Sequence, residues 1–113
     1  MLYRLKLLPG IEKQLARLVD VDRARVIDAL RALASEPRPA GTVHLLENLY
    51  RIRVGDHRIV FAVFNAEVVV LICKVARRNE TTYRDVRALL RRAKEERASG
   101  PTSRPDVRRR KRG

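Results

Sequence analysis

The sequence predicts a single α+β domain in which one sheet packs against helices. Two segments with apolar residues at helical spacing come first, a series of short extended segments follows, and a third helical segment comes last. Runs of hairpins placed between helices in this order are typical of an α+β fold. The length of 113 residues fits one small domain. We therefore expect an antiparallel or mixed sheet of roughly four to five strands, packed with two N-terminal helices and one C-terminal helix.

The N-terminal part predicts one strand and two helices. Residues 2–8 alternate apolar and polar side chains, as a half-buried strand does. Pro9 suits the first turn of a helix, in which the apolar positions are Ile11, Leu15, Leu18 and Val19. Asp20 or Asp22 can cap a second helix, in which the apolar stripe is Val26, Ile27, Leu30, Leu33 and Ala34. Because very few residues join the two helices, we expect them to be antiparallel neighbours.

The middle of the chain predicts a series of hairpins. A loop rich in Pro and Gly spans residues 36–41. The strand candidates after it are residues 43–46, 49–54, 57–65 and 67–76. Gly55 and Asp56 predict a tight turn because Gly tolerates positive φ and Asp favours turns. The last of these strands is apolar almost throughout, so we expect it to be central and covered on both faces.

The C-terminal part predicts a helix and then a tail. Thr81 or Thr82 can cap the helix, and Thr82 with Asp85 resembles a capping box. Its apolar side consists of Val86, Leu89, Leu90 and Ala93. From residue 98 the composition changes to Ser, Gly and Pro and then to consecutive basic residues, with nothing apolar to bury. We therefore expect a folded domain over residues 1–97 and a basic tail over 98–113 that is disordered when free.

Charge and composition narrow the function. The net charge is +13, and the first ninety residues alone hold sixteen basic and ten acidic residues. A basic excess in the folded part indicates a nucleic acid or an acidic protein as partner. A single Cys73 excludes an internal disulfide and fits a reducing cytosol. With no long apolar run, no secretory signal pattern, no zinc-ligand spacing and no Gly-rich phosphate loop, we expect a cytoplasmic protein without metal or cofactor.

Three arginines converge in the predicted hairpin. Arg51 and Arg53 share one strand face, and the turn that follows folds Arg58 back toward them. Such a cluster suits a polyanion, and it could stabilise the charge that develops on a phosphate during RNA cleavage. Arginine does not readily accept a proton, so a base must come from elsewhere, with Tyr83 and His57 as the candidates. The alternative for the three arginines is a solvated basic face. The alternative for His57 is a partly buried strand residue that makes one hydrogen bond.

Two segments resemble toxins of the RelE/ParE superfamily, which belong to bacterial toxin–antitoxin systems. The first runs Tyr-Arg-Ile-Arg-Val-Gly-Asp-His-Arg-Ile-Val-Phe over residues 50–61, and the second runs Val-Ala-Arg-Arg-Asn-Glu-Thr-Thr-Tyr-Arg over residues 75–84. Residues 45–49 resemble the Lys-Leu-x-Gly segment of the family without its Lys and Gly. The resemblance covers about residues 2–90. The motif at residues 50–56 is specific for the superfamily but weaker on which target a member attacks, and the retained residues Arg51, Arg53, Arg58, Arg78 and Tyr83 favour the RelE-like branch.

The RelE-like branch implies a metal-independent, ribosome-dependent endoribonuclease that cuts mRNA in the ribosomal A site. By motif position, the residues it implies for catalysis are Arg58, Arg78 and Tyr83, and those for RNA binding are Arg51, Arg53, His57 and Arg77. Arg51 and Arg53 stand where some members have Lys, which removes a Lys-type base from these positions. As alternatives, Arg78 could pair with Glu80 or Asp85, and Tyr83 could be a packing residue.

Two other functions are open at this point. One is the ParE-like inhibition of DNA gyrase, and the other is a non-catalytic basic module that binds RNA or the ribosome. The family also implies a cognate antitoxin, acidic where it meets the toxin, and a toxin–antitoxin complex that binds operator DNA through the antitoxin. The partners we expect are therefore the antitoxin, the ribosome and mRNA, without a membrane. The basic tail either stays solvated or adds affinity for RNA phosphates.

Overall fold

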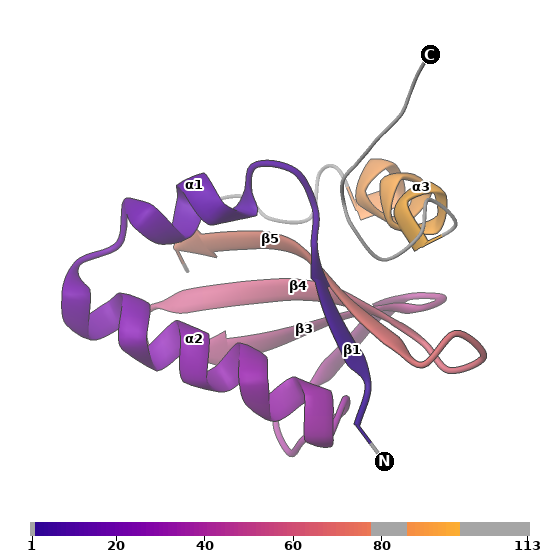
Figure 1. Cartoon of the computed structure of the whole chain (residues 1–113), viewed down its shortest axis with the longest axis horizontal. Helices are drawn as coiled ribbons and strands as arrows, with labels where there is room; N and C mark the ends of the chain where they lie inside the picture. The colour runs from indigo at the N-terminus through magenta and orange to yellow at the C-terminus, as the bar shows by residue number, and fades with distance from the viewer. Residues whose placement is uncertain (1, 78–85, 98–113) are drawn as a thin grey trace.

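The computed structural model describes residues 2–77 and 86–97. Its elements, in chain order, are β1 (Arg4–Leu7), α1 (Ile11–Ala16), α2 (Asp20–Ser35), β2 (Val43–Leu46), β3 (Leu49–Val54), β4 (His57–Phe64), β5 (Val69–Arg77) and α3 (Val86–Arg97). Figure 1 shows them packed into one α+β domain, which confirms the predicted fold class and helix order.

The sheet has five strands in the order β1-β5-β4-β3-β2. The hairpins β2–β3, β3–β4 and β4–β5 are antiparallel. The strand β1 runs parallel to β5, which is possible because a long connection that includes α1 and α2 separates the two strands in the sequence. The prediction that the last strand is central and covered is confirmed, since β5 lies between β1 and β4. Only Lys74 and Arg77 of β5 are not buried.

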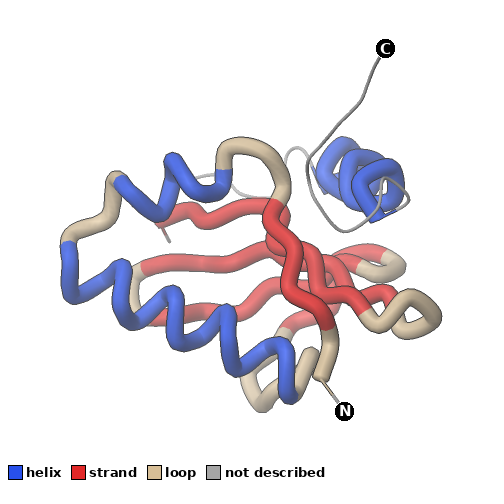
Figure 2. Tube along the Cα trace, viewed as in Figure 1, coloured by secondary structure: helices blue, strands red, loops and turns tan. Residues whose placement is uncertain are grey.

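Helices cover the two faces of the sheet unequally. On one face lie α1 and α2, which run in opposite directions as predicted (Figure 1). The stripe of α2 buries Val26, Leu30 and Leu33. On the other face α3 buries Leu89, Leu90 and Ala93, which confirms its predicted apolar side. A loop leads from α2 to β2, as predicted for residues 36–41 (Figure 2).

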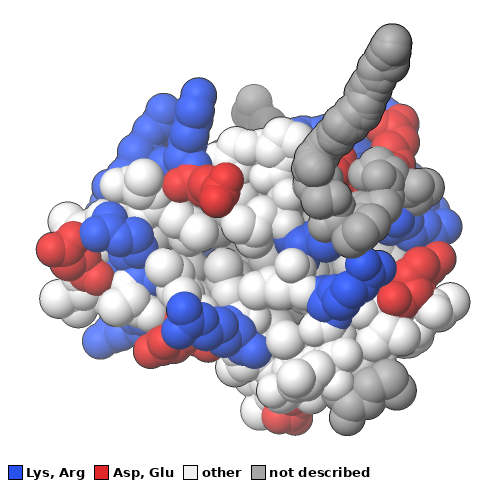
Figure 3. Space-filling model, in the orientation of Figure 1, with Lys and Arg blue, Asp and Glu red and all other residues white. Residues whose placement is uncertain are grey.

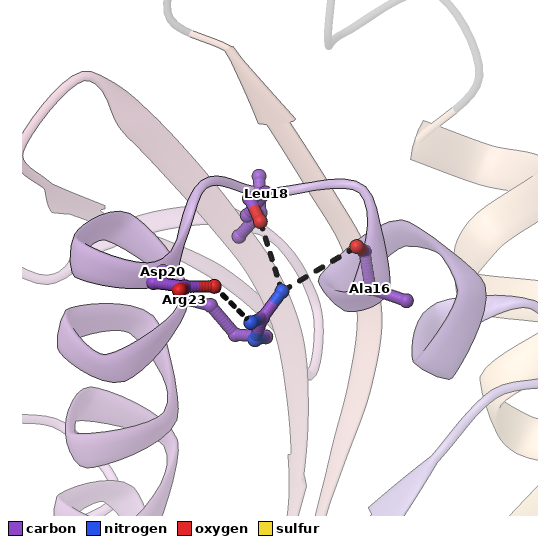
Figure 4. A network of polar contacts seen from close by, with 4 residues as sticks. All are labelled: Ala16, Leu18, Asp20 and Arg23. Atoms are coloured by element: carbon purple, nitrogen blue, oxygen red, sulfur yellow. Dashed lines mark hydrogen bonds and ion pairs between the residues drawn. The ribbon is translucent and has the colours of Figure 1, made fainter.

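The predicted starts of the first two helices are wrong. Pro9 precedes α1, whose N-cap is Gly10. The N-cap of α2 is Val19, which is 67% exposed rather than part of an apolar stripe, and no side chain caps this helix. The guanidinium of Arg23 holds the turn before α2 by donating hydrogen bonds to the carbonyl oxygens of Leu18 and Ala16 (Figure 4). The first-turn carboxylate of Asp20 pairs with Arg23 instead of capping.

Two turns set the register of the central hairpins. The Gly55–Asp56 turn is as predicted, and Gly55 has a φ of 59°. The next turn is longer than predicted: it spans residues 65–68, and the N–H of Val68 donates to the carbonyl oxygen of Asn65 at 3.2 Å. Val68 has a φ of 57°, which ends the extended backbone, so β5 begins at Val69 rather than at residue 67.

Some predictions fall outside the part of the chain that the structure describes. The caps at Thr81 and Thr82, the partner Asp85 and the tail over residues 98–113 are among them. No helix in the described ranges is long and apolar enough to cross a membrane.

Candidate nucleic-acid interface

The strand register places the three hairpin arginines on one face of the sheet. Arg53 of β3 lies directly opposite Arg58 of β4, and Arg51 lies opposite Val60. Residues that face each other in an antiparallel pair point to the same side. The predicted convergence of Arg51, Arg53 and Arg58 is therefore confirmed as geometry.

A fourth cation joins them from β5. Val60 is also the register partner of Lys74, so the row Arg51, Val60 and Lys74 crosses three strands beside the pair formed by Arg53 and Arg58. We call Arg51, Arg53, Arg58 and Lys74 the basic face. Sequence reasoning missed Lys74, although a charged residue inside the apolar run of residues 68–76 is the signal that could have found it.

The basic face shares its side of the sheet with α3. Successive residues of β4 alternate between faces, so Arg58, Val60 and Phe64 point the same way. The guanidinium of Arg97 from α3 lies 4.6 Å from the centre of the Phe64 ring. The helix therefore covers the end of this face near the β4–β5 turn, and the four cations occupy the end near the β3–β4 turn. On the side that carries α2, Lys and Arg lie in separate spots among Asp and Glu (Figure 3).

The arginine stems are partly buried. Val60 beneath them is 0% exposed, whereas Arg51 and Arg58 are half-buried and Arg53 is exposed. The Nε atom of Arg58 is buried without a hydrogen-bond partner. A buried donor left unpaired destabilises the protein, and a phosphate oxygen is a strong acceptor for it. The geometry thus suits an anion that approaches Arg58 from the basic face.

Two other predicted RNA-binding residues lie on the opposite face. His57 precedes Arg58 on β4 and therefore points toward α1 and α2, where its register partner on β5 is Arg77. His57 is 3% exposed, so it is more deeply buried than expected, and its Nε2 atom has no hydrogen-bond partner. The structure thus separates His57 and Arg77 from the basic face.

The remaining predicted catalytic residues, Arg78 and Tyr83, lie outside the described residues. Cys73 is buried, and this burial raises the pKa of its thiol to about 12, so it acts as a small core residue rather than a nucleophile. His44 is exposed, with Nε2 2.7 Å from the carbonyl oxygen of Glu47. Within the described ranges no three His, Cys, Asp or Glu side chains are grouped as metal ligands.

Known proteins share both the sequence pattern and the fold. Residues 5–82 match the family model described as the ParE toxin of the type II toxin–antitoxin system parDE. The search of curated proteins returned no match. Among solved structures, the archaeal RelE–RelB complex from Pyrococcus horikoshii OT3 is 27% identical with a TM-score of 0.63, and the match covers 72% of this chain and 100% of that one.

Two structures from E. coli show the same fold at lower identity. A free RelE mutant is 20% identical over 85% of this chain and 98% of that one, with a TM-score of 0.62. A chain of the intact RelBE toxin–antitoxin complex is 22% identical over 69% of this chain and 99% of that one, with a TM-score of 0.61. With the matching family model and the RelE-like sheet, the chain belongs to the ParE toxin family of type II toxin–antitoxin systems, within the RelE/ParE superfamily.

Proposed function

We propose that this toxin is a metal-independent endoribonuclease that cleaves mRNA in the ribosomal A site and so inhibits translation. The observation that carries the proposal is the basic face, where three guanidiniums and one ammonium group from three neighbouring strands share one side of the sheet. Adjacent strands lie about 5 Å apart, so cations on two of them can contact one phosphate and its neighbour. A nucleic-acid backbone is a polyanion that such a spacing fits.

In this proposal the arginines bind the phosphate and stabilise its charge, and other groups transfer the protons. In the proposed reaction the 2′-hydroxyl of the RNA attacks the adjacent phosphorus, and the bond to the 5′-oxygen breaks. Arg53 and Arg58 hold the phosphate oxygens and stabilise the negative charge that grows there. A base takes the proton of the 2′-hydroxyl, and an acid gives a proton to the departing 5′-oxygen. The products are a 2′,3′-cyclic phosphate and a 5′-hydroxyl.

Proton transfer needs a residue other than arginine, which stays charged. On the described basic face only Lys74 has a side chain that can lose its proton. Tyr83 is the second candidate, and Arg78 adds a further cation at the end of β5. We assign RNA contacts to Arg51 as well, while His57 and Arg77 would reach RNA only on the opposite face of the sheet.

The second candidate is inhibition of DNA gyrase, which the matching ParE family model favours. One experiment separates the two targets. The purified toxin is added to a translating extract, and the 5′ ends of the mRNA are mapped by primer extension; the same preparation is added to a gyrase supercoiling assay. Cleavage in codon register on ribosomes supports the nuclease. Lost supercoiling with intact mRNA overturns it in favour of gyrase, and binding without either effect leaves a non-catalytic module.

A cognate antitoxin is the partner that a type II toxin requires, and the RelE structures from P. horikoshii and E. coli include complexes with RelB. We propose that the antitoxin of this protein places an acidic segment across the basic face or displaces α3. The complex would bind operator DNA through the antitoxin, and the toxin would act in the cytoplasm, where its ribosomal target is.

A further inference from the structure

A cavity of about 350 Å³ lies on the helix side of the sheet, beside the far end of β5. It exists there because β1 pairs with β5 only as far as Ile72, so the edge of β5 is open beyond that residue. The side chain of Gln14 from α1 reaches this edge, where its Oε1 accepts a hydrogen bond from the N–H of Val75 at 2.9 Å. The described residues that line the cavity are Gln14, Arg17, Leu18, His57, Lys74, Val75 and Arg77.

His57 lines this cavity with a buried nitrogen atom that has no hydrogen-bond partner. Its side chain is 3% exposed, and its Nε2 atom has no hydrogen-bond partner. Most buried polar atoms in folded proteins have a partner, because an unmade hydrogen bond costs stability. A molecule bound in the cavity would supply one.

The polar groups around His57 are donors. The carbonyl oxygen of Gln14 is already engaged by the backbone of β5, so its amide NH₂ is the group left for a ligand. Arg17 is exposed on the rim, and Arg77 adds positive charge. Lys74 also borders the cavity, but strand register places it on the side of the basic face, so it is given no part in this site. None of the described lining residues is an Asp or Glu. A set of donors and cations without a carboxylate selects an oxyanion.

We propose that this cavity binds a phosphate group, either free or as part of a nucleotide. The site is separate from the basic face, because the neighbours His57 and Arg58 point to opposite sides of β4. In it, His57 donates from Nε2, Gln14 donates from its amide nitrogen, and Arg17 pairs with the outer oxygens. The proposal needs no catalytic step and holds whether the toxin acts on mRNA or on gyrase.

The two histidines of the chain make a direct test possible, since His44 serves as an internal control on the surface. The full-length protein is labelled with ¹⁵N and held in a phosphate-free buffer. Long-range ¹H–¹⁵N spectra then follow both imidazole rings during titration with inorganic phosphate and, separately, with adenosine 5′-monophosphate. We expect the ring nitrogens of His57 to shift saturably toward a form protonated at Nε2, while those of His44 stay unchanged. A sodium chloride titration controls for ionic strength.

A matched pair of arginine variants locates the binding. Arg17→Gln should weaken phosphate binding at least tenfold, whereas Arg31→Gln, an exposed residue of α2 that does not line the cavity, should leave it unchanged. Thermal unfolding of both variants checks that the fold survives. Tighter binding of the nucleotide than of phosphate assigns the site to nucleotides, and equal binding assigns it to the phosphate group alone.

The proposal is overturned if His57 does not respond, if both histidines respond alike, or if the two arginine variants weaken binding equally. The ribosome assay is read separately. Phosphate binding without mRNA cleavage overturns only the proposed nuclease activity, and mRNA cleavage without phosphate binding overturns only this site.

Discussion

Arginine at positions 51 and 53 limits what the basic face can do by itself. A guanidinium binds phosphate through two parallel hydrogen bonds but stays protonated, whereas a lysine can both bind and exchange a proton. Lys74 restores that capacity from β5, across Val60 of β4 from Arg51. At the scale of single residues, binding and proton transfer are therefore divided between β3 and β5 in our proposal.

Removal of Arg58 should abolish toxicity while the fold survives. Arg58→Ala takes away a cation that faces the transition state, so we expect mRNA cleavage to fall by about 100-fold or more. Ribosome-bound mRNA cleavage and growth after induced expression measure this loss. Arg31→Ala is the matched control, because it removes an exposed arginine from α2. If circular dichroism shows that the Arg58 variant is unfolded, the loss does not report on catalysis; we expect the same result for Arg78→Ala.

Lys74→Arg should separate binding from chemistry. The positive charge remains, so affinity for a short RNA should change little, whereas the cleavage rate should fall by about 100-fold or more because general-base assistance is lost. Single-turnover cleavage and RNA binding are measured on the same variant. The control is Lys13→Arg, which changes an exposed lysine of α1. Unchanged cleavage by Lys74→Arg would assign the proton transfer to Tyr83 or to the ribosome.

At the scale of elements, α3 is held to the sheet by polar contacts at both sides. The Nζ atom of Lys6 on β1 donates to the carbonyl oxygen of Glu96 at 3.0 Å, and burial lowers the pKa of this lysine. The Nζ atom of Lys94 lies 2.7 Å from Oε1 of Glu47, in the β2–β3 turn. These contacts fix the helix beside the basic face and so set how much of that face is open.

The link between Lys94 and Glu47 should show in a titration. The hydrogen bond and positive charge of Lys94 hold the pKa of the Glu47 carboxyl below its ordinary value of 4.5. The stabilisation from this contact is therefore fully present above pH 4.5. It is lost as the pH falls through the lowered pKa that the Glu47 carboxyl has in the folded protein. We expect ¹³C NMR of the Glu47 carboxyl to give a midpoint below 4.5, and Lys94→Gln to return it toward 4.5. An unchanged midpoint in the variant would mean that the two residues are not coupled in solution.

The β3–β4 turn should depend on glycine at position 55. Its φ of 59° is strained for residues with a side chain. A Cβ atom there would lie 3.2 Å from Nη1 of Arg25, but that flexible end can move aside. Gly55→Ala should therefore destabilise the protein by about 1 kcal/mol through the backbone. Gly55→Asn should cost less, since Asn tolerates this conformation better. Urea denaturation measures both, and an alanine variant as stable as the parent would contradict the expected strain.

At the scale of the whole molecule, positive charge is distributed over the domain and its C-terminal end. The net charge is +13, and residues 98–113 contribute six basic residues and one acidic residue. Binding to RNA releases counterions, so affinity should fall with salt in proportion to the number of phosphates contacted.

Truncation after residue 97 tests whether the basic tail takes part. We expect the shortened protein to keep its unfolding midpoint, because residues 98–113 contain almost nothing apolar to bury. We also expect weaker ribosome binding and a plot of log affinity against log salt whose slope is smaller by up to about 4, if all six basic residues contact single-stranded RNA. A variant with the six basic residues changed to Gln controls for tail length. An unchanged slope would show that the tail stays solvated.

The sequence by itself determined the elements and the cluster of three arginines. Helical spacing defined α2 and α3, and the pair Gly55–Asp56 fixed the hairpin, because these signals depend on neighbours along the chain. Neighbouring residues in the sequence do not predict where α2 starts. The turn before α2 is held by the guanidinium of Arg23, which donates to carbonyl groups of that turn, and these contacts form only once the turn is folded.

Only the tertiary structure decided which face of the sheet each candidate side chain lies on and which other residues lie beside it. Alternation along β4 places His57 and Arg58 on opposite faces of the sheet. Pairing between β4 and β5 brings Lys74 into the row of Arg51 and Val60, and it places His57 beside Arg77. The cavity next to His57 exists because β1 ends early and α1 crosses the open edge of β5. These contacts join residues that are far apart in the chain, and strand register creates them. Local sequence patterns specify this register only weakly between non-adjacent segments.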